Sequence, residues 1–207
     1  MEQYFTQNPT TKDEIYKFNW NALGKDFVFN TSNSVFSKTA VDFGTMVMIE
    51  TFVENERDFK GSILDLGCGY GPVGVILAKI MGDVKITMVD INERAVKLSS
   101  LNGEENKVSS KLNIFQSNIF ERVENSFDRI LTNPPIRAGK ETVYTFFDGA
   151  FEHLKTSGKL YVVIQKKQGA KSAIDKLTQL FDNCETLYKK SGYFILCCTK
   201  QCAVNDE

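Results

Sequence analysis

Residues 63–74 read Ile63-Leu64-Asp65-Leu66-Gly67-Cys68-Gly69-Tyr70-Gly71-Pro72-Val73-Gly74. The apolar run that opens this segment predicts a buried strand that ends near Asp65. Four glycines then follow within eight residues. Pro72 favours the first turn of a helix, because the N–H that it lacks would have no partner there. A strand, a glycine turn and a helix start in this order let the backbone approach a polar or anionic ligand closely.

A second segment bears on which ligand this turn binds. Residues 69–74 fit the pattern G-x-G-x-x-G with Asp90 about 20 residues later, which a nicotinamide-dependent reductase would also have. Downstream, the apolar run Ile130-Leu131-Thr132 ends in Asn133-Pro134-Pro135-Ile136. Asp65 ahead of the glycines and Asn-Pro-Pro after a later strand resemble the class I S-adenosylmethionine (AdoMet) methyltransferases that methylate nitrogen.

The length and composition of the chain limit the kind of protein that it can be. Its 207 residues, 42% hydrophobic and 25% charged, predict one globular domain with enough core to fold alone. We find no signal peptide and no apolar run that could span a membrane, so we expect a cytoplasmic protein with no membrane partner. The five cysteines lack ligand-like spacing and are expected to be buried and reduced. The single histidine, His153, is expected at a helix end, and no metal site is predicted.

Positive charge is concentrated in the residues that follow Asn-Pro-Pro. Residues 137–171 hold seven Lys or Arg against three acids, whereas the whole chain has a net charge of −1. A local basic patch is enough to attract phosphate, although such a run is also typical of a solvated face. The candidate substrate contacts are Ile136, Arg137, Lys140, Lys166 and Lys167.

Alternating strands and helices predict an α/β fold with a doubly wound, mostly parallel sheet of seven strands. We expect strands at 63–66, 85–89, 112–116, 127–132, 160–164, 186–189 and 193–199, the last one antiparallel. Helices are expected at 42–57, 73–81, 92–106, 141–154 and 170–181. Residues 14–20 and 25–29 predict a hairpin that packs on the domain or floors a substrate cleft. The single domain would then comprise a hairpin extension (1–34), a catalytic core (35–200) and a tail (201–207).

Polar residues end four successive strands of this predicted sheet, namely Asp65, Asp90, Asn118 and Asn133. Because the carboxyl ends of parallel strands share one edge, these side chains should converge on one crevice. A carboxylate at Asp90 can accept both ribose hydroxyls of an adenosine, and the amide of Asn118 can meet the adenine amino group. The simpler alternative for Asp90 is a cap for the helix that starts near Asn92.

The remaining cofactor contacts follow from the same placement. Ile91 can pack on the adenine face, and the glycines let the chain pass the sugar and the methionine portion. Asp65 either orients the glycine turn or receives the ammonium group of the methionine portion. The candidate cofactor contacts are Phe36, Asp65, Gly67, Gly69, Gly71, Asp90, Ile91, Asn118 and Asn133.

Asn133-Pro134-Pro135 indicates the chemistry. An exocyclic amino group on a base is a poor nucleophile, because its lone pair is drawn into the ring. Two acceptors held against its two N–H bonds, the Asn133 side-chain oxygen and the Pro134 carbonyl, would make that lone pair available. The prolines stiffen the backbone that carries these acceptors. The simpler alternative is a Pro-Pro turn that ends a strand.

Longer motifs narrow the family. With the segments above, Ser34-Val35-Phe36-Ser37-Lys38, Val41-Asp42-Phe43-Gly44-Thr45, Met88-Val89-Asp90-Ile91-Asn92, Ser117-Asn118 and Gln165-Lys166-Lys167-Gln168-Gly169 resemble the "methyltransferase small" family. The match covers nearly the whole chain, and within this family the chain is similar to the ribosomal RNA small subunit methyltransferase C type. It implies that the segment with Phe36 covers the cofactor, whereas the pattern alone indicates a loop and a helix capped by Asp42.

Two departures from that type matter. Its members carry two homologous domains, and this chain has room for the catalytic one alone. They also place an aromatic residue after Asn-Pro-Pro to stack on the target base, whereas this chain has Ile136. Stacking must then come from elsewhere, for example from Phe36, or the substrate differs.

The resemblance implies an AdoMet-dependent N-methyltransferase that acts on the 2-amino group of a guanine in 16S ribosomal RNA. Its partner would be ribosomal RNA or the small ribosomal subunit, and the oligomeric state stays open. The alternatives are methylation of a protein glutamine amide of the release-factor type, a non-catalytic AdoMet- or RNA-binding module, and a nicotinamide-dependent reductase. Intact Asp90, Asn118 and Asn133-Pro134-Pro135 count against a non-catalytic module.

Overall fold

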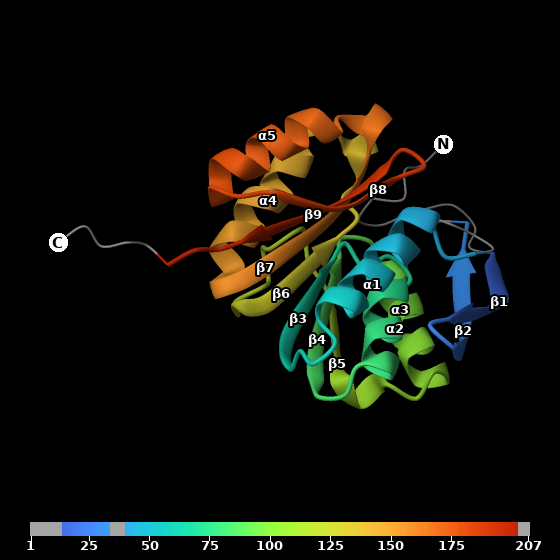
Figure 1. Cartoon of the computed structure of the whole chain (residues 1–207). Helices are drawn as coiled ribbons and strands as arrows, with labels where there is room; N and C mark the ends of the chain where they lie inside the picture. The colour runs from blue at the N-terminus through green and yellow to red at the C-terminus, as the bar shows by residue number, and fades with distance from the viewer. Residues whose placement is uncertain (1–13, 34–39, 203–207) are drawn as a thin grey trace.

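The computed structural model describes residues 14–33 and 40–202 and shows a seven-stranded sheet with a two-stranded hairpin beside it (Figure 1). The strands are β1 (Ile15–Ala22), β2 (Lys25–Ser32), β3 (Gly61–Leu66), β4 (Val84–Asp90), β5 (Leu112–Gln116), β6 (Phe127–Thr132), β7 (Leu154–Gln165), β8 (Glu185–Lys190) and β9 (Tyr193–Thr199). The helices are α1 (Phe43–Asn55), α2 (Pro72–Ile80), α3 (Glu93–Glu105), α4 (Lys140–His153) and α5 (Ala170–Phe181).

The order of strands in the large sheet is β5-β4-β3-β6-β7-β9-β8. Strands β3 to β7 pair in parallel, and β9 runs antiparallel to both β7 and β8. The chain builds outward from β3 to β5 and then returns to the other side of β3 with β6. Ligands of such sheets bind outside the carboxyl ends of the strands where the order reverses. The predicted doubly wound, mostly parallel sheet of seven strands is confirmed.

Helices cover both faces of the sheet, α1 to α3 on one and α4 with α5 on the other (Figure 1). In β7, Tyr161 and Val163 enter the core under α1, whereas Leu160, Val162 and Ile164 enter the core under α4 and α5. Because both faces are buried, the central strands read as continuous apolar runs in the sequence and not as an alternation.

The hairpin of β1 and β2 is fastened to α3 by two buried asparagines. The side-chain oxygen of Asn102 accepts from the backbone N–H of Asn30 at 2.7 Å, and that of Asn106 accepts from Val28 N–H at 3.1 Å. The two amide nitrogens donate back to the carbonyls of the same residues, Asn30 and Val28, at 2.9 and 2.7 Å. The expectation that the hairpin packs on the domain is confirmed. None of its described residues borders the two cavities described below, and its role as the floor of a substrate cleft stays a prediction.

Local signals set most element ends. The side chain of Asp42 accepts from Thr45 N–H at 3.1 Å and caps α1, and the side chain of Asn92 caps α3 by accepting from Arg94 N–H at 2.9 Å. His153 ends α4 as expected. One strand differs from expectation: β7 starts at Leu154 and not at residue 160. Residues 157 and 158, predicted as a connection, instead exchange backbone hydrogen bonds with Lys200 beyond the end of β9.

Three further expectations can be compared with the structure. Cys68, Cys197 and Cys198 are buried as predicted, but Cys184 is half-buried and Cys202 is exposed, and all five thiols are free. No helix among residues 14–33 and 40–202 has the length and apolarity needed to cross a membrane. The segment with Phe36, predicted to cover the cofactor, lies outside the described residues.

Candidate functional site

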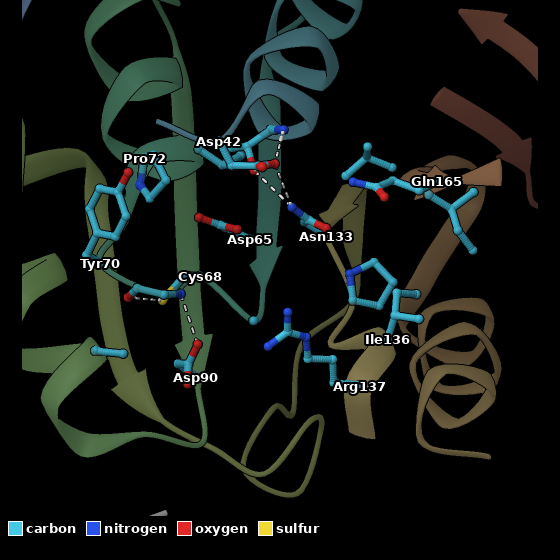
Figure 2. Close-up of a pocket in the computed structure, with 18 of the residues that line it drawn as sticks. Asp42, Asp65, Cys68, Tyr70, Pro72, Asp90, Asn133, Ile136, Arg137 and Gln165 are labelled. Atoms are coloured by element: carbon cyan, nitrogen blue, oxygen red, sulfur yellow. Dashed lines mark hydrogen bonds between the residues drawn. The ribbon is translucent and has the colours of Figure 1, made fainter. Parts of the chain in front are cut away.

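Two adjoining cavities open at the carboxyl edge of the sheet, with volumes of about 390 and 270 Å³. Gly67, Asp90 and Asn133 border both of them, so the two cavities form one continuous site. Figure 2 shows Asp65, Asp90 and Asn133 directed toward the larger cavity from neighbouring strands. Three of the four predicted strand-end residues therefore lie together there, and the fourth, Asn118, borders the smaller cavity.

The two aspartates are held by backbone N–H groups. The Asp90 carboxylate accepts from Gly69 N–H at 2.9 Å with one oxygen and from Asn92 N–H at 2.8 Å with the other. Asp65 accepts from Gly74 N–H at 3.0 Å, inside the first turn of α2. No ion pair within the described part of the chain involves either carboxylate.

Burial without a cation changes the acidity of these groups. Burial raises the pKa of Asp65 to about 7, although the Gly74 N–H opposes the rise, and the charge of Asp90 adds to it. Burial also raises the pKa of Asp90, against three backbone N–H groups that lower it. Carboxylates in this state gain from a ligand that supplies a cation or hydroxyl donors. The ammonium and ribose groups of AdoMet supply both, so these residues fit that cofactor.

The glycines of the turn differ in what they do. Gly67 and Gly69 border the larger cavity, where the backbone lies against the open space. Gly71 borders neither cavity. It caps α2 with φ 91°, and a Cβ there would lie 2.9 Å from the methyl carbon of Met88 and 3.0 Å from the Ser99 hydroxyl. The structure therefore gives a packing reason for this glycine, and its contact with the cofactor stays a prediction.

The smaller cavity is lined mainly by apolar side chains. Ile91 borders it as predicted, together with Ile119 and with Phe146 from α4. The amide nitrogen of Asn118 donates to the Glu121 carboxylate at 2.6 Å, which leaves its amide oxygen as the acceptor for a ligand. A mainly apolar cavity with this acceptor suits an adenine ring and its amino group. Phe146 escaped prediction, because its helical spacing indicates only a core residue.

The Asn133 side chain is held in one orientation from α1. Its amide nitrogen donates to the Thr45 hydroxyl at 3.0 Å and approaches the capping carboxylate of Asp42 at 3.4 Å (Figure 2). Because a carboxylate only accepts, the nitrogen has to face Asp42 and the oxygen has to face away. That oxygen accepts no hydrogen bond from any residue in the described ranges, and Asn133 is a residue that borders both cavities. Asp42 and Thr45 were not predicted in this role, since only the packing of α1 brings them to Asn133.

The two prolines after Asn133 have different surroundings. Pro134 borders the larger cavity, and Pro135 borders the smaller one. The carbonyl of Pro135 accepts from Ala138 N–H at 2.9 Å and so belongs to the short helical turn Ile136–Ala138. Asn133 and Pro134 thus meet the larger cavity, while Pro135 fixes the turn that follows.

The basic residues divide into two groups. Arg137 and Ile136 border the larger cavity, and the Arg137 guanidinium extends into it on the side of Asp90 (Figure 2). Lys140, Lys166 and Lys167 are exposed and border neither cavity. The predicted patch over 137–171 is not continuous, because Lys155 and Lys159 pair with Asp128 and Glu56 at the opposite edge of the sheet.

One wall of the larger cavity comes from the far strands of the sheet. Gln165 ends β7, Tyr193 begins β9, and the two are directly paired in the antiparallel ladder. Both border the cavity, as does Gln168. Gln165 was predicted in a loop, although the rule that polar residues at parallel strand ends face the ligand also applies to it.

Comparison with known proteins identifies the family. The family model described as "Methyltransferase small domain" matches residues 26–197. The "Uncharacterized protein YbxB" of Bacillus subtilis (strain 168) is 48% identical over 94% of this chain and 96% of its own length. Ribosomal RNA small subunit methyltransferase C of Vibrio parahaemolyticus is 30% identical over 90% of this chain and 54% of its own.

A solved structure has the same fold. The 16S rRNA N2 G1207 methyltransferase of T. thermophilus, in complex with AdoMet and guanosine, superposes with a TM-score of 0.82 at 25% identity. The match covers 93% of this chain and 52% of that one, so this chain spans about half the length of the ribosomal RNA methyltransferases that it matches. The chain belongs to the methyltransferase small domain family, and its fold is that of the class I AdoMet methyltransferases.

Proposed function

We propose that this protein transfers a methyl group from AdoMet to the exocyclic 2-amino group of a guanine in 16S ribosomal RNA. The observation that carries the proposal is the fixed orientation of Asn133, whose oxygen is left for a ligand where the two cavities meet. The identity of the relatives supports the RNA substrate, since two of them are named as 16S or small-subunit ribosomal RNA methyltransferases.

Different site residues bind the three parts of the cofactor. The smaller cavity takes the adenine between Ile91 and Phe146, with the Asn118 oxygen as acceptor for the amino group. Asp90 borders both cavities and takes the ribose hydroxyls at their junction. Asp65 receives the ammonium of the methionine portion, and its charge is then compensated. This order directs the sulfur toward Asn133 and Pro134, where the cavities meet.

Catalysis then rests on acceptors held in place before the substrate arrives. AdoMet supplies a methyl group on a positively charged sulfur. The oxygens of Asn133 and Pro134 accept the two N–H bonds of the amine and hold its lone pair toward that carbon. As the nitrogen–carbon bond forms, the carbon–sulfur bond breaks with its electrons going to sulfur, and the nitrogen releases one proton to water. The two oxygens stabilise the positive charge that develops on nitrogen, and because they are fixed they need no reorganisation.

The RNA has to deliver a single base to this point. A paired guanine cannot reach Asn133, so it has to leave its stack. Arg137 at the cavity and the exposed Lys140, Lys166 and Lys167 beside it supply positive charge for the phosphates next to that base.

The test compares RNA and protein acceptors with the purified chain. We expect tritium from methyl-labelled AdoMet to enter the small ribosomal subunit or its free 16S RNA, and not a release factor with an unmethylated glutamine. Label in the release factor alone would overturn the RNA substrate and assign glutamine as the acceptor. Binding of AdoMet without transfer to either acceptor would overturn the catalytic role itself.

A further inference from the structure

The larger cavity has one aromatic wall on its substrate side, formed by Tyr193. Among the described residues two aromatic rings border this cavity, Tyr70 and Tyr193. Tyr70 lies within the glycine turn and makes edge-to-face contacts with Phe18 and Phe29 of the hairpin, at 6.3 and 5.7 Å between ring centroids. Tyr193 stands at the other end, on the strand next to β7, with Asn133 and Pro134 between the two rings in the order of the sheet.

The Tyr193 ring is fixed on three sides. Its hydroxyl accepts from the Gln165 amide nitrogen at 2.6 Å. A Cβ on Gly44 would lie only 2.6 Å from the ring, so α1 packs directly against it through the bare glycine backbone. Phe43, which is 49% exposed, meets the ring edge-on with centroids 5.2 Å apart. A ring held in this way loses little conformational entropy when a ligand covers its free surface.

The Gln165–Tyr193 pair also keeps two polar groups unused. The Gln165 amide nitrogen donates to the Tyr193 hydroxyl, so the Gln165 amide oxygen is still available as an acceptor. The hydroxyl hydrogen of Tyr193 is likewise still available as a donor. No described residue takes up either group. Guanine places a ring N–H donor next to its 2-amino group, followed by a carbonyl acceptor, so its edge needs an acceptor and then a donor. Adenine has a ring-nitrogen acceptor beside its amino group, followed by a C–H, so at that position it needs a donor where guanine needs an acceptor.

We propose that Tyr193 is the surface on which the target base stacks, and that Gln165 reads the edge of that base next to its amino group. The inference rests on the proposed function and names the acceptor as a guanine. It also explains how the chain can have the non-aromatic Ile136 after Asn-Pro-Pro, because the Tyr193 ring from β9 supplies the surface for stacking.

The experiment measures KM for 16S RNA and the Kd for AdoMet in three variants. Tyr193→Leu removes the ring, Tyr193→Phe keeps the ring without its hydroxyl, and Tyr188→Leu is a matched control on the same β8–β9 hairpin whose side chain borders neither cavity. Loss of base stacking on an aromatic side chain weakens binding by about tenfold to a hundredfold. We expect that increase in KM for Tyr193→Leu, less than about fivefold for Tyr193→Phe, and unchanged AdoMet affinity in all three.

Gln165→Leu tests the reading of the base edge. Transfer to guanine should fall while AdoMet affinity stays, and discrimination between guanosine and 2-aminopurine riboside, which lacks the ring N–H, should shrink. If Tyr193→Leu does not fold, Tyr193→Met fills a similar volume without a ring and permits the same comparison.

Two failures can be told apart. If the wild-type chain methylates RNA and Tyr193→Leu has the KM of Tyr188→Leu, the stacking role is wrong and the proposed function stands. If the wild-type chain methylates a protein glutamine and not RNA, both proposals are overturned together.

Discussion

The two edges of the sheet bury carboxylates in opposite ways. At the amino edge, Glu56 is buried but accepts from Arg129 at 2.8 Å, from Lys159 at 3.0 Å and from the Tyr161 hydroxyl at 2.8 Å. At the carboxyl edge, Asp65 and Asp90 have backbone N–H partners and no cation within the described chain. The partners lower the pKa of Glu56 in spite of its burial, whereas burial raises the pKa of Asp65 and Asp90.

The difference separates stability from function. The charge of the buried Glu56 carboxylate is balanced by two cations within the protein. These ion pairs connect the end of α1 to β6 and β7, at the sheet edge opposite the site. A buried carboxylate without one is costly to the free protein unless a ligand supplies the missing charge or donors. We therefore expect substitutions at the amino edge to change folding and those at the carboxyl edge to change binding and transfer.

The largest effect should follow from Glu56→Ala. Removing this carboxylate leaves Arg129 and Lys159 without their counter-charge, and loss of one partner from a buried pair costs about 3–5 kcal/mol of unfolding free energy. Urea denaturation measures it, with Glu54→Ala on the exposed side of α1 as the matched control. AdoMet affinity of the folded fraction should be unchanged. A loss below about 1 kcal/mol would place Glu56 among ordinary surface ion pairs.

Asn133→Ala should be next in size and purely catalytic. Removal of one fixed acceptor or donor at a transition state lowers kcat about 100- to 1000-fold. Single-turnover transfer measures the rate, and calorimetry should show AdoMet binding within about twofold of wild type, a free-energy change well under 1 kcal/mol. Thr45→Val, which frees the Asn133 amide, should lower kcat less, with recovery in Thr45→Ser. Full transfer by Asn133→Ala would remove Asn-Pro-Pro from the mechanism.

Asp90→Asn should affect the cofactor and not the fold. The amide keeps the shape but loses one acceptor for the ribose hydroxyls, and loss of such hydrogen bonds to a charged group costs about 1.5–3 kcal/mol, or about tenfold to a hundredfold in Kd. The free protein loses a buried charge but also loses one of the two backbone N–H hydrogen bonds that hold this carboxylate, so its thermal stability should change little. A variant that binds AdoMet normally would contradict the role of Asp90.

The smallest expected change in AdoMet affinity is a dependence on pH that comes from Asp65. Its raised pKa of about 7 means that the folded chain binds a proton that the unfolded chain releases near pH 4. Its contribution to stability is therefore present below about pH 4 and is lost as the pH rises to about 7, the reverse of the sign for Glu56. AdoMet, which needs the ionised carboxylate, should bind about tenfold more tightly at pH 8 than at pH 6. Asp65→Asn should remove both trends, and a flat profile in the wild type would assign Asp65 to the turn alone.

The sequence was enough for the parts of the site that depend on strand ends. Asp65, Asp90 and Asn133 could be placed because parallel strands end at one edge. Thr45 and Tyr193 could not, because their place depends on α1 packing through Gly44 onto β9, and the apolar pattern does not specify that contact. The early start of β7 could not be predicted for a similar reason, since residues 157 and 158 form their backbone hydrogen bonds with Lys200, far along the chain.

The most direct test of the account asks which atom receives the methyl group. Small-subunit RNA incubated with the chain and labelled AdoMet can be digested to nucleosides and separated by mass spectrometry. The account predicts label in N2-methylguanosine with the wild-type chain, and the same product formed about 100- to 1000-fold more slowly with Asn133→Ala. Label on a ring nitrogen, on adenosine or on a ribose would contradict it, because Asn133 and Pro134 can then not be holding an exocyclic guanine amine.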